Sequence, residues 1–323
     1  MTNKSNNFLS PRLQRLYDDI QVDGQKALET FWTEIAQHGS PMIEPSTNGY
    51  SLVTFLWRDD GQAQQIAVIQ DWGADGIREH HMNRLPGTDV WHVTRQMRND
   101  TRTTYQLSPS ASDDPNELAP YQLDPLNPKK FTAYLSETGH NIYFSLLELP
   151  EAPALPWRQT HSIPTGLIKL HRPFDDQRRF WVYLPATPLT HSLPLLVVFD
   201  GRQYKDMLHL PEMLGYLITQ GQIPPVTALL VDNLGHRELL CQSEFADYMA
   251  NKVLPWIRDT HSMTIDPNAT IVIGSSYSGL AAASIAKHSH RPGVIAGARS
   301  YNPTTFKKST VILAVAPQSN SPS

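Results

Sequence analysis

Apolar positions recur at helical spacing near the start of the chain and alternate with polar ones further along. Residues 8–38 predict helix, because apolar side chains recur three or four residues apart, as in Leu13, Leu16, Phe31 and Ile35. From 50 to 107 the pattern changes to short runs rich in β-branched and aromatic residues: 50–57, 65–72, 89–93 and 103–107. Turn sequences and no helical pattern lie between these runs, so this region predicts a β-sandwich.

The next segment is rich in proline, serine and aspartate. Prolines recur throughout residues 108–165, as in Asp124-Pro125 and Asn127-Pro128. Proline has no N–H to donate to a sheet, so we expect irregular structure and linker here rather than central strands.

The C-terminal half alternates continuous apolar runs with helical patterns. The runs 179–184, 195–199, 227–231 and 269–273 are typical of strands buried on both faces. Helical patterns cover 207–220, 244–259 and 280–287. Strands that alternate with helices predict an α/β fold with a mostly parallel sheet and helices on both faces.

Composition and charge narrow the class of protein. The chain has 323 residues, 40% of them hydrophobic, which is typical of a globular protein of about two domains. A net charge of −4 argues against nucleic acid as the main partner. Cys241 is the single cysteine, so no internal disulfide forms, and no histidine pair has metal-ligand spacing. No apolar run approaches the ~20 residues of a membrane span, and no signal peptide is visible, so we expect a cytoplasmic protein.

One strand-to-helix junction is typical of a nucleophile elbow. The strand 269–273 leads into Gly274-Ser275-Ser276-Tyr277-Ser278-Gly279, and then a helix of small residues begins. This context predicts Ser276 as a nucleophile, with the Tyr277 N–H stabilising an oxyanion. The usual pattern is Gly-x-Ser-x-Gly, and here Ser278 stands at its last position. The alternative is a serine-rich turn that only caps a helix.

A second loop follows the strand 195–199. The N–H of Gly201 or Arg202 is the candidate for the second oxyanion-hole donor, and Asp200 would anchor the turn. Arg202 would face either an anionic substrate or solvent.

A third loop, residues 232–240, follows the strand 227–231, at the sheet edge where ligands bind in open α/β folds. Arg237 and Glu238 would order the site, form a salt-bridged loop, or do both. His236 is interpreted as a loop residue rather than the catalytic base.

Several segments together resemble the enterochelin (enterobactin) esterases, which are esterase-D-type α/β-hydrolases. In the C-terminal half these are VVFDGRQY (197–204), QGQIPPVTALLVDNLGHREL (220–239), CQSEFADYMANKVLPW (241–256) and IVIGSSYSGLAAA (271–283). In the N-terminal half they are LPGTDVWHV (85–93), LDPLNP (123–128) and LLELPEAP (146–153). The resemblance implies a helical extension over 1–44, a β-sandwich domain over 45–150, a linker over 151–166 and a hydrolase domain over 167–288.

The resemblance also implies a function. The family consists of cytoplasmic serine esterases that cleave the trilactone of a ferric catecholate siderophore and so release iron inside the cell. Ser276 would then be the nucleophile, Gly201, Arg202 and Tyr277 would form the oxyanion hole, and Arg202, Arg237 and Glu238 would lie in the pocket. Arg84 and Arg102 would contact the catecholate arms. No cofactor is implied, because Fe(III) arrives with the substrate.

The end of the chain predicts impaired catalysis. The resemblance stops near His288, the residues after it are expected to be a non-family tail, and the chain after Ser276 has room for about one more strand. His288 and His290 would lie ~18 Å along a helix from Ser276, out of reach of its hydroxyl. We therefore expect a truncated esterase. The alternatives are a divergent member that uses His236 as its base, a carboxylesterase acting on feruloyl-type or other acyl esters, and a non-catalytic siderophore-binding fragment.

Overall fold

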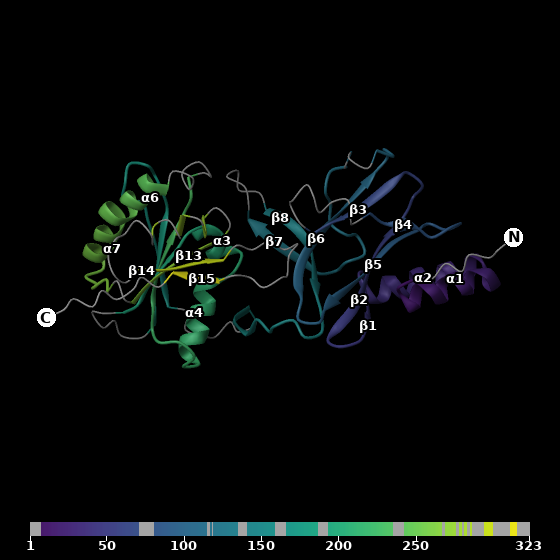
Figure 1. Ribbon diagram of the computed structural model, residues 1–323, viewed down its shortest axis with the longest axis horizontal. Helices are drawn as coiled ribbons and strands as arrows, with labels where there is room; N and C mark the ends of the chain where they lie inside the picture. Colours follow the sequence, from purple (N-terminus) through teal and green to yellow (C-terminus); the bar gives the residue numbers. More distant parts are fainter. Residues whose placement is uncertain are drawn as a thin grey trace. The chain divides into compact units, whose positions relative to one another are not determined.

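The structure, a computed structural model, forms two compact units, residues 1–154 and 155–323 (Figure 1). It describes residues 8–70, 81–114, 117, 119–134, 141–158, 166–186, 193–234, 242–266, 269–275, 278–279, 281–282, 285, 294–299 and 311–314. Each unit has its own hydrophobic cores, so each is described separately.

The first unit begins with two helices, α1 (Pro11–Asp23) and α2 (Gln25–His38). Ser10 caps α1, because its hydroxyl accepts a hydrogen bond from the Leu13 N–H at 3.2 Å. Gly24, with φ of 55°, separates the helices, so the predicted helix over 8–38 is two helices. Their buried side chains pack against Leu56, Leu85 and Val90 of the following β-structure.

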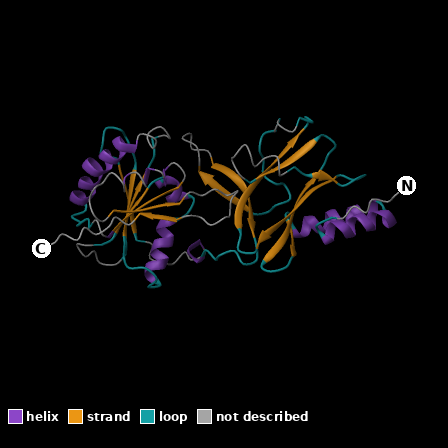
Figure 2. Ribbon diagram, viewed as in Figure 1, coloured by secondary structure: helices purple, strands orange, loops and turns teal. Residues whose placement is uncertain are grey.

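Two four-stranded sheets make up the rest of this unit (Figure 2). The first has the order β1-β2-β5-β4 and consists of β1 (Met42–Pro45), β2 (Tyr50–Arg58), β5 (Val90–Arg98) and β4 (Asn83–Arg84). The second has the order β3-β6-β8-β7 and consists of β3 (Gln65–Ile69), β6 (Arg102–Ser110), β8 (Asn141–Glu148) and β7 (Lys130–Tyr134). Their facing side chains form one core, in which the rings of Phe55 and Tyr105 lie 4.9 Å apart. The predicted β-sandwich is confirmed.

The interpretation of 108–165 as irregular structure and linker is wrong for part of that range. β7 and β8 lie within it, and β8 is an inner strand of the second sheet. Pro109 is tolerated in β6 because β6 pairs with β8 over residues 102–105 and with β3 over 106–110. At Pro109 the strand therefore needs ladder hydrogen bonds on one side only.

The second unit contains a seven-stranded sheet of order β15-β14-β13-β11-β12-β10-β9. The strands β11 (Leu195–Val198), β12 (Thr227–Val231), β13 (Thr270–Ser275) and β14 (Val294–Arg299) run parallel. At one edge β10 (Phe180–Leu184) and β9 (Leu167–His171) pair antiparallel, and at the other β15 (Val311–Ala314) does so. Because β10 runs against β12, the beginning of β10 lies at the edge of the sheet where the parallel strands end.

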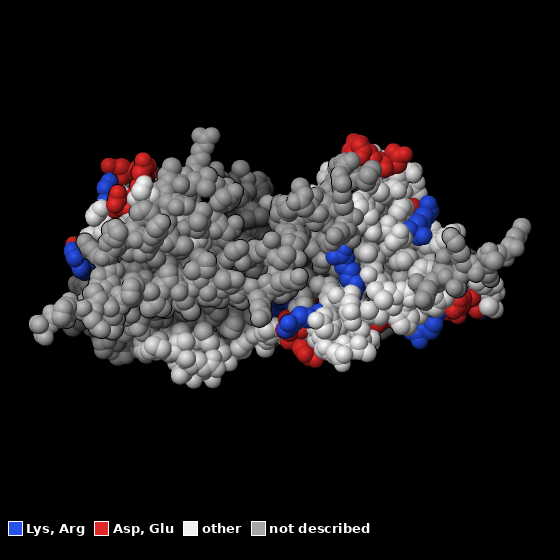
Figure 3. Space-filling view, viewed as in Figure 1, with Lys and Arg blue, Asp and Glu red and all other residues white. Residues whose placement is uncertain are grey.

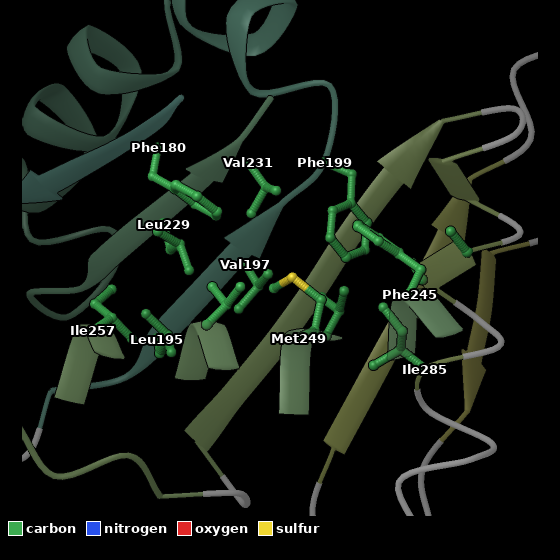
Figure 4. Close-up of a cluster of buried hydrophobic side chains, with 14 of the residues drawn as sticks. Phe180, Leu195, Val197, Phe199, Leu229, Val231, Phe245, Met249, Ile257 and Ile285 are labelled. Atoms are coloured by element: carbon green, nitrogen blue, oxygen red, sulfur yellow. The ribbon is translucent and has the colours of Figure 1, made fainter. Parts of the chain in front are cut away.

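Helices cover both faces of this sheet, which accounts for the continuous burial of β10 and β12 along their whole length. On one face, α4 (Leu210–Thr219) packs against Trp181, Ala228 and Leu230, and α3 (Gly201–Asp206) precedes it. On the other face lie α6 (Gln242–Tyr248), a π-helical turn (Met249–Val253) and α7 (Leu254–Thr260). Figure 4 shows Phe245 beside Phe199 of the sheet, and their ring centroids are 5.2 Å apart. A short 3-10 helix, Pro156–Arg158, begins the unit. The predicted α/β class is confirmed.

The residues after 288 form more of the sheet than the sequence predicted. Two strands, β14 and β15, lie there, where room for about one was expected. β14 continues the parallel order beside β13, and β15 pairs antiparallel with β14. Antiparallel neighbours need no crossover helix, so a short connection after β14 is enough to bring β15 beside it.

The described surface carries small groups of charges. On the face in Figure 3, basic and acidic side chains of the described residues lie in small, separate groups, with no broad basic area among them. Within the described ranges, no helix is both long and apolar enough to cross a bilayer.

Candidate active site

The candidate site lies where the central strands of the second unit end. β11 is flanked by β12 and β13, so the loops after these three strands lie next to one another. The Phe199 N–H extends the β11–β13 ladder by donating to the Ile273 carbonyl at 2.9 Å. The chain leaves the sheet at the following residue, Asp200, which begins α3 as its N-cap.

Gly274 shows why the turn after β13 needs a small residue. A side chain on Gly274 would overlap the carbonyl group of Ser278 and lie 2.7 Å from the Gly279 nitrogen. The backbone at 278–279, which is helical, therefore folds directly against the end of β13. This close approach is what a nucleophile elbow requires. Ser276 and Tyr277 themselves lie outside the described residues.

Gly201 lies against the backbone of a neighbouring strand. A Cβ at this position would lie 2.7 Å from both the Leu230 carbonyl carbon and the Val231 nitrogen. The glycine therefore allows close packing on the backbone of β12, rather than only a close approach to substrate. Gly201 and Arg202 are the first two residues of α3, where N–H groups have no carbonyl partner within the helix.

Asp200 joins the three loops. Its backbone is left-handed, with φ of 55° and ψ of 39°, a conformation that costs most residues other than glycine about 1 kcal/mol. Its carboxylate accepts one hydrogen bond from the Asn233 amide, after β12, and another from the Ser278 hydroxyl, after β13. The predicted anchoring role of Asp200 thus has a specific form, in which one side chain holds the ends of two neighbouring strands.

Two consecutive arginines brace the same edge of the sheet. Arg179 pairs with Asp232, with 2.6 Å between Nε and Oδ2, and its guanidinium lies 5.5 Å from the Trp181 ring centroid. Arg178 is 2% exposed and donates to the Asp232 carbonyl at 2.8 Å. These contacts fix the start of the loop after β12 to the start of β10.

The guanidinium of Arg178 also reaches α6. It lies 5.2 Å from the ring centroid of Tyr248 and 5.5 Å from that of Phe245. The Tyr248 hydroxyl donates to Asp176 at 2.9 Å, and burial is the main cause that raises the pKa of Tyr248 to about 12. The phenol therefore remains a donor at neutral pH, and α6 is held to the turn before β10.

Of the other residues predicted to line the pocket, Arg202 lies among the described residues and the rest do not. The Nε of Arg202 lies 3.9 Å from Asp206 on the next turn of α3, with the side chain 18% exposed. Arg237, Glu238 and His236 lie outside the described residues, as do His288 and His290. Their roles stay predictions.

Arg84 and Arg102, the two candidates in the first unit, both hold their own strands in place. Arg84 donates to the Thr88 carbonyl at 3.0 Å and lies 3.5 Å from the buried carboxylate of Asp59. Arg102 donates to Glu148 at 2.8 Å and to the Pro153 carbonyl at 2.7 Å. These contacts order the β-structure, and contact of either arginine with substrate stays a prediction.

Sequence reasoning missed the contributions of Asn233, Arg178 and Arg179. For Asn233 a signal was present, because polar residues lie within two positions of the ends of the three buried runs that become β11, β12 and β13, whereas Arg178 and Arg179 precede β10. Recognising it required the strand order, which brings those three ends together. Across the described chain, no group of three or more His, Cys, Asp and Glu side chains is arranged to hold a metal ion.

Comparison with known proteins agrees with this architecture. Residues 52–158 match the family model for the N-terminal domain of enterochelin esterase, and residues 172–305 match an esterase family model. The chain belongs to the enterochelin esterase family. The second match continues past residue 288, where the sequence suggested that the resemblance stops, and it includes β14.

Individual relatives support the family membership. The iron(III) enterobactin esterase of Dickeya dadantii (strain 3937) is 29% identical over 301 residues, which cover 80% of this chain and 67% of that protein. The iron(III) salmochelin esterase of Escherichia coli O6:H1 is 26% identical and covers 86% of this chain and 69% of its own length. A crystal structure of the enterobactin esterase FES from Shigella flexneri in the presence of enterobactin superposes with a TM-score of 0.63. It is 26% identical and covers 80% of this chain and 72% of its own.

Proposed function

We propose that this chain is a serine esterase that hydrolyses the trilactone ester bonds of a ferric catecholate siderophore in the cytoplasm. The observation that carries the proposal is the edge of the α/β sheet, where Gly201 and the turn after Gly274 follow the neighbouring strands β11 and β13. That arrangement supports an esterase elbow facing an oxyanion loop. Relatives that act on enterobactin and salmochelin supply the substrate class.

In this proposal the chemistry is acyl transfer in two steps. The Ser276 hydroxyl loses its proton to a general base, and its oxygen attacks an ester carbonyl of the siderophore ring. The N–H groups of Gly201 or Arg202 and of Tyr277 stabilise the oxyanion. The ester C–O bond then breaks, the released serine hydroxyl takes a proton, and water hydrolyses the acyl-enzyme.

Opening the ring explains how hydrolysis would release iron. Each cleavage removes one covalent link between the catecholate arms, so the three arms no longer bind Fe(III) as a single preorganised ligand. Arg202, Arg237 and Glu238 are proposed to line the pocket, where the arginines attract the anionic complex. The iron belongs to the substrate and needs no site of its own on the protein.

Mass spectrometry of the products tests the proposal. Purified protein incubated with ferric enterobactin is expected to yield linear trimer, dimer and monomer of dihydroxybenzoyl-serine. Ser276→Ala is expected to abolish these products, and Ser289→Ala, which lies outside the proposed machinery, serves as the control. Equal product formation by the wild-type and Ser276→Ala proteins would rule out Ser276 as the nucleophile.

The same assay tests the prediction of impaired turnover. The sequence predicts slow hydrolysis, because neither His288 nor His290 is expected to reach the Ser276 hydroxyl. A rate comparable to that of the Shigella flexneri esterase would contradict it. Binding of the ferric siderophore without any products would favour the non-catalytic alternative.

A further inference from the structure

The hydrogen bond between Ser278 and Asp200 connects two loops whose relative position must stay fixed for the proposed reaction. Ser278 lies two residues after the proposed nucleophile, and Asp200 lies immediately before the proposed oxyanion donor Gly201. Ser278 is 1% exposed and Asp200 is half-buried, so water has limited access to this hydrogen bond. A hydrogen bond to an ionised carboxylate is stronger than one between two neutral groups.

Three features make the Asp200 end of this contact rigid. The Asn233 amide donates to the other carboxylate oxygen, so both oxygens are engaged. The Asp200 carbonyl accepts from the Tyr204 N–H at 3.1 Å, which closes the first turn of α3. Gly201 packs against the backbone of β12, so the peptide after Asp200 has little room to rotate.

The Ser278 end is equally constrained, because its backbone lies against Gly274 at the end of β13. The Gly-x-Ser-x-Gly pattern has glycine at this position, and glycine has no side chain to donate. A serine here places a hydroxyl within reach of the neighbouring loop without widening the turn.

We propose that Ser278 and Asp200 are positioning residues that couple the nucleophile elbow to the oxyanion loop. The serine that departs from the usual pattern is therefore a functional element, and not only a small residue that the turn tolerates. The inference rests on the proposed function for the roles of Ser276 and Gly201. The coupling itself rests on contacts among Asp200, Asn233 and Ser278 alone.

Four variants distinguish the effect of the Ser278 hydroxyl from the effect of side-chain size. Ser278→Gly restores the usual pattern but removes the donor, and Ser278→Ala removes only the hydroxyl. Ser278→Thr keeps the hydroxyl. Asp200→Asn suits the left-handed backbone and replaces one acceptor oxygen by a donor group.

The matched control is Thr270→Val. Thr270 is 4% exposed and donates to the Asp266 carbonyl at 2.7 Å, at the opposite end of the same strand β13. The Thr270→Val substitution removes a hydroxyl hydrogen bond of similar kind and leaves both loops unchanged.

Labelling of Ser276 by a fluorophosphonate is the first measurement. In this reaction the serine oxygen bonds to phosphorus, the P–F bond breaks, and fluoride leaves with the hydroxyl proton. Ser278→Gly, Ser278→Ala and Asp200→Asn are expected to lower the maximal labelling rate about ten- to hundredfold while the half-saturating probe concentration stays unchanged. Ser278→Thr restores most of the rate, and Thr270→Val labels like the wild type at equal Tm.

Hydrogen exchange of the peptide covering residues 199–206 is the second measurement, and it needs no activity. Ser278→Ala is expected to speed exchange in this peptide, and Thr270→Val is not. Unchanged exchange together with wild-type labelling of Ser278→Gly overturns the inference. If the wild-type protein is not labelled at Ser276, the proposed function fails, and the exchange result alone decides whether the two loops are coupled.

Discussion

His92 is a titratable ring enclosed in the β-structure of the first unit. It lies on β5 between β2 and β4, is 8% exposed, and meets the Phe8 ring edge-on at 5.5 Å. Burial lowers its pKa from 6.5 to about 4, because the charged imidazolium would lose its hydration. The folded unit therefore keeps this ring neutral in mildly acidic solution.

Acid is expected to destabilise the first unit through His92. Between pH 6.5 and about 4, the unfolded chain binds a proton that the folded chain does not. The stabilisation is complete above pH 6.5 and is lost as the pH falls to the folded pKa, up to about 3 kcal/mol. Urea unfolding across this range should show a shallower pH dependence for His92→Phe. His38→Phe, at an exposed position, is the control, and parallel curves for wild type and His92→Phe would contradict the prediction.

The role of a residue could be predicted where it follows from the local sequence alone. The tight turn at Gly274 could be predicted because a buried strand precedes it and a helix of small residues follows it, whereas the packing of Gly201 on β12 depends on the strand order. The partnership of Asp200 with Asn233 and Ser278 could not be predicted, because it depends on which strands are neighbours. Likewise, nothing in the sequence distinguishes the internal ion pairs of Arg84 and Arg102 from substrate contacts.

At the scale of elements, a buried polar loop fastens the end of α2 to the second sheet of the sandwich. The Tyr105 hydroxyl donates to Asp124 at 2.6 Å and accepts from the Asn127 amide at 2.9 Å. The Ser40 N–H, just after α2, donates to the Leu126 carbonyl at 2.9 Å. Gly39 packs so closely here that a Cβ would lie 2.9 Å from Pro128 Cδ.

Alanine at Gly39 should therefore destabilise the protein more than alanine at a similar but open glycine. Gly39 and Gly49 have φ of 83° and 76°, so alanine is strained at both positions, and the ψ of 175° at Gly39 lies in a region almost exclusive to glycine. Only Gly39 also has close neighbours, since nothing lies within 4 Å of a Cβ at Gly49. We expect Gly39→Ala to lower the free energy of unfolding by about 1–3 kcal/mol more than Gly49→Ala. If denaturant unfolding shows the same loss of free energy for both variants, the neighbours of Gly39 can move to accept a Cβ, and the prediction is wrong.

Element prediction succeeded where hydrophobic period and turn residues agreed, as for β2, β10 and β12. It failed for β7 and β8 because the surrounding prolines outweighed their short apolar runs. Those prolines lie mainly in the loops beside the strands, a distinction that depends on register.

At the scale of the whole molecule, the two units have separate hydrophobic cores. Both cores of the first unit use residues before 150, and both cores of the second use residues after 167. The division into a sandwich and an α/β unit was predictable because the hydrophobic period changes between them. The order of the edge strands was not, since β15 pairs antiparallel with β14 and so departs from the parallel order of the central strands.

The first unit is expected to fold on its own. A fragment of residues 8–154 contains both of its cores and should unfold cooperatively on heating, with native near-ultraviolet circular dichroism. A fragment of residues 42–154 lacks α1 and α2, which uncovers Leu56, Leu85 and Val90, and should melt at a lower temperature. A broad, non-cooperative transition of the longer fragment would contradict this.

The π-helical turn between α6 and α7 has a consequence for the packing of this helical segment. The large buried side chains of this segment, Phe245, Met249, Val253 and Ile257, are spaced four, four and four apart. In a regular α-helix each step of four overshoots a full turn by about 40°, so buried faces normally alternate steps of three and four. Removing one residue from Met249–Val253 would leave the spacing four, three, four. The wider π-helical turn thus accommodates one residue more than an α-helical turn would, while both flanking helices keep their buried faces toward the sheet.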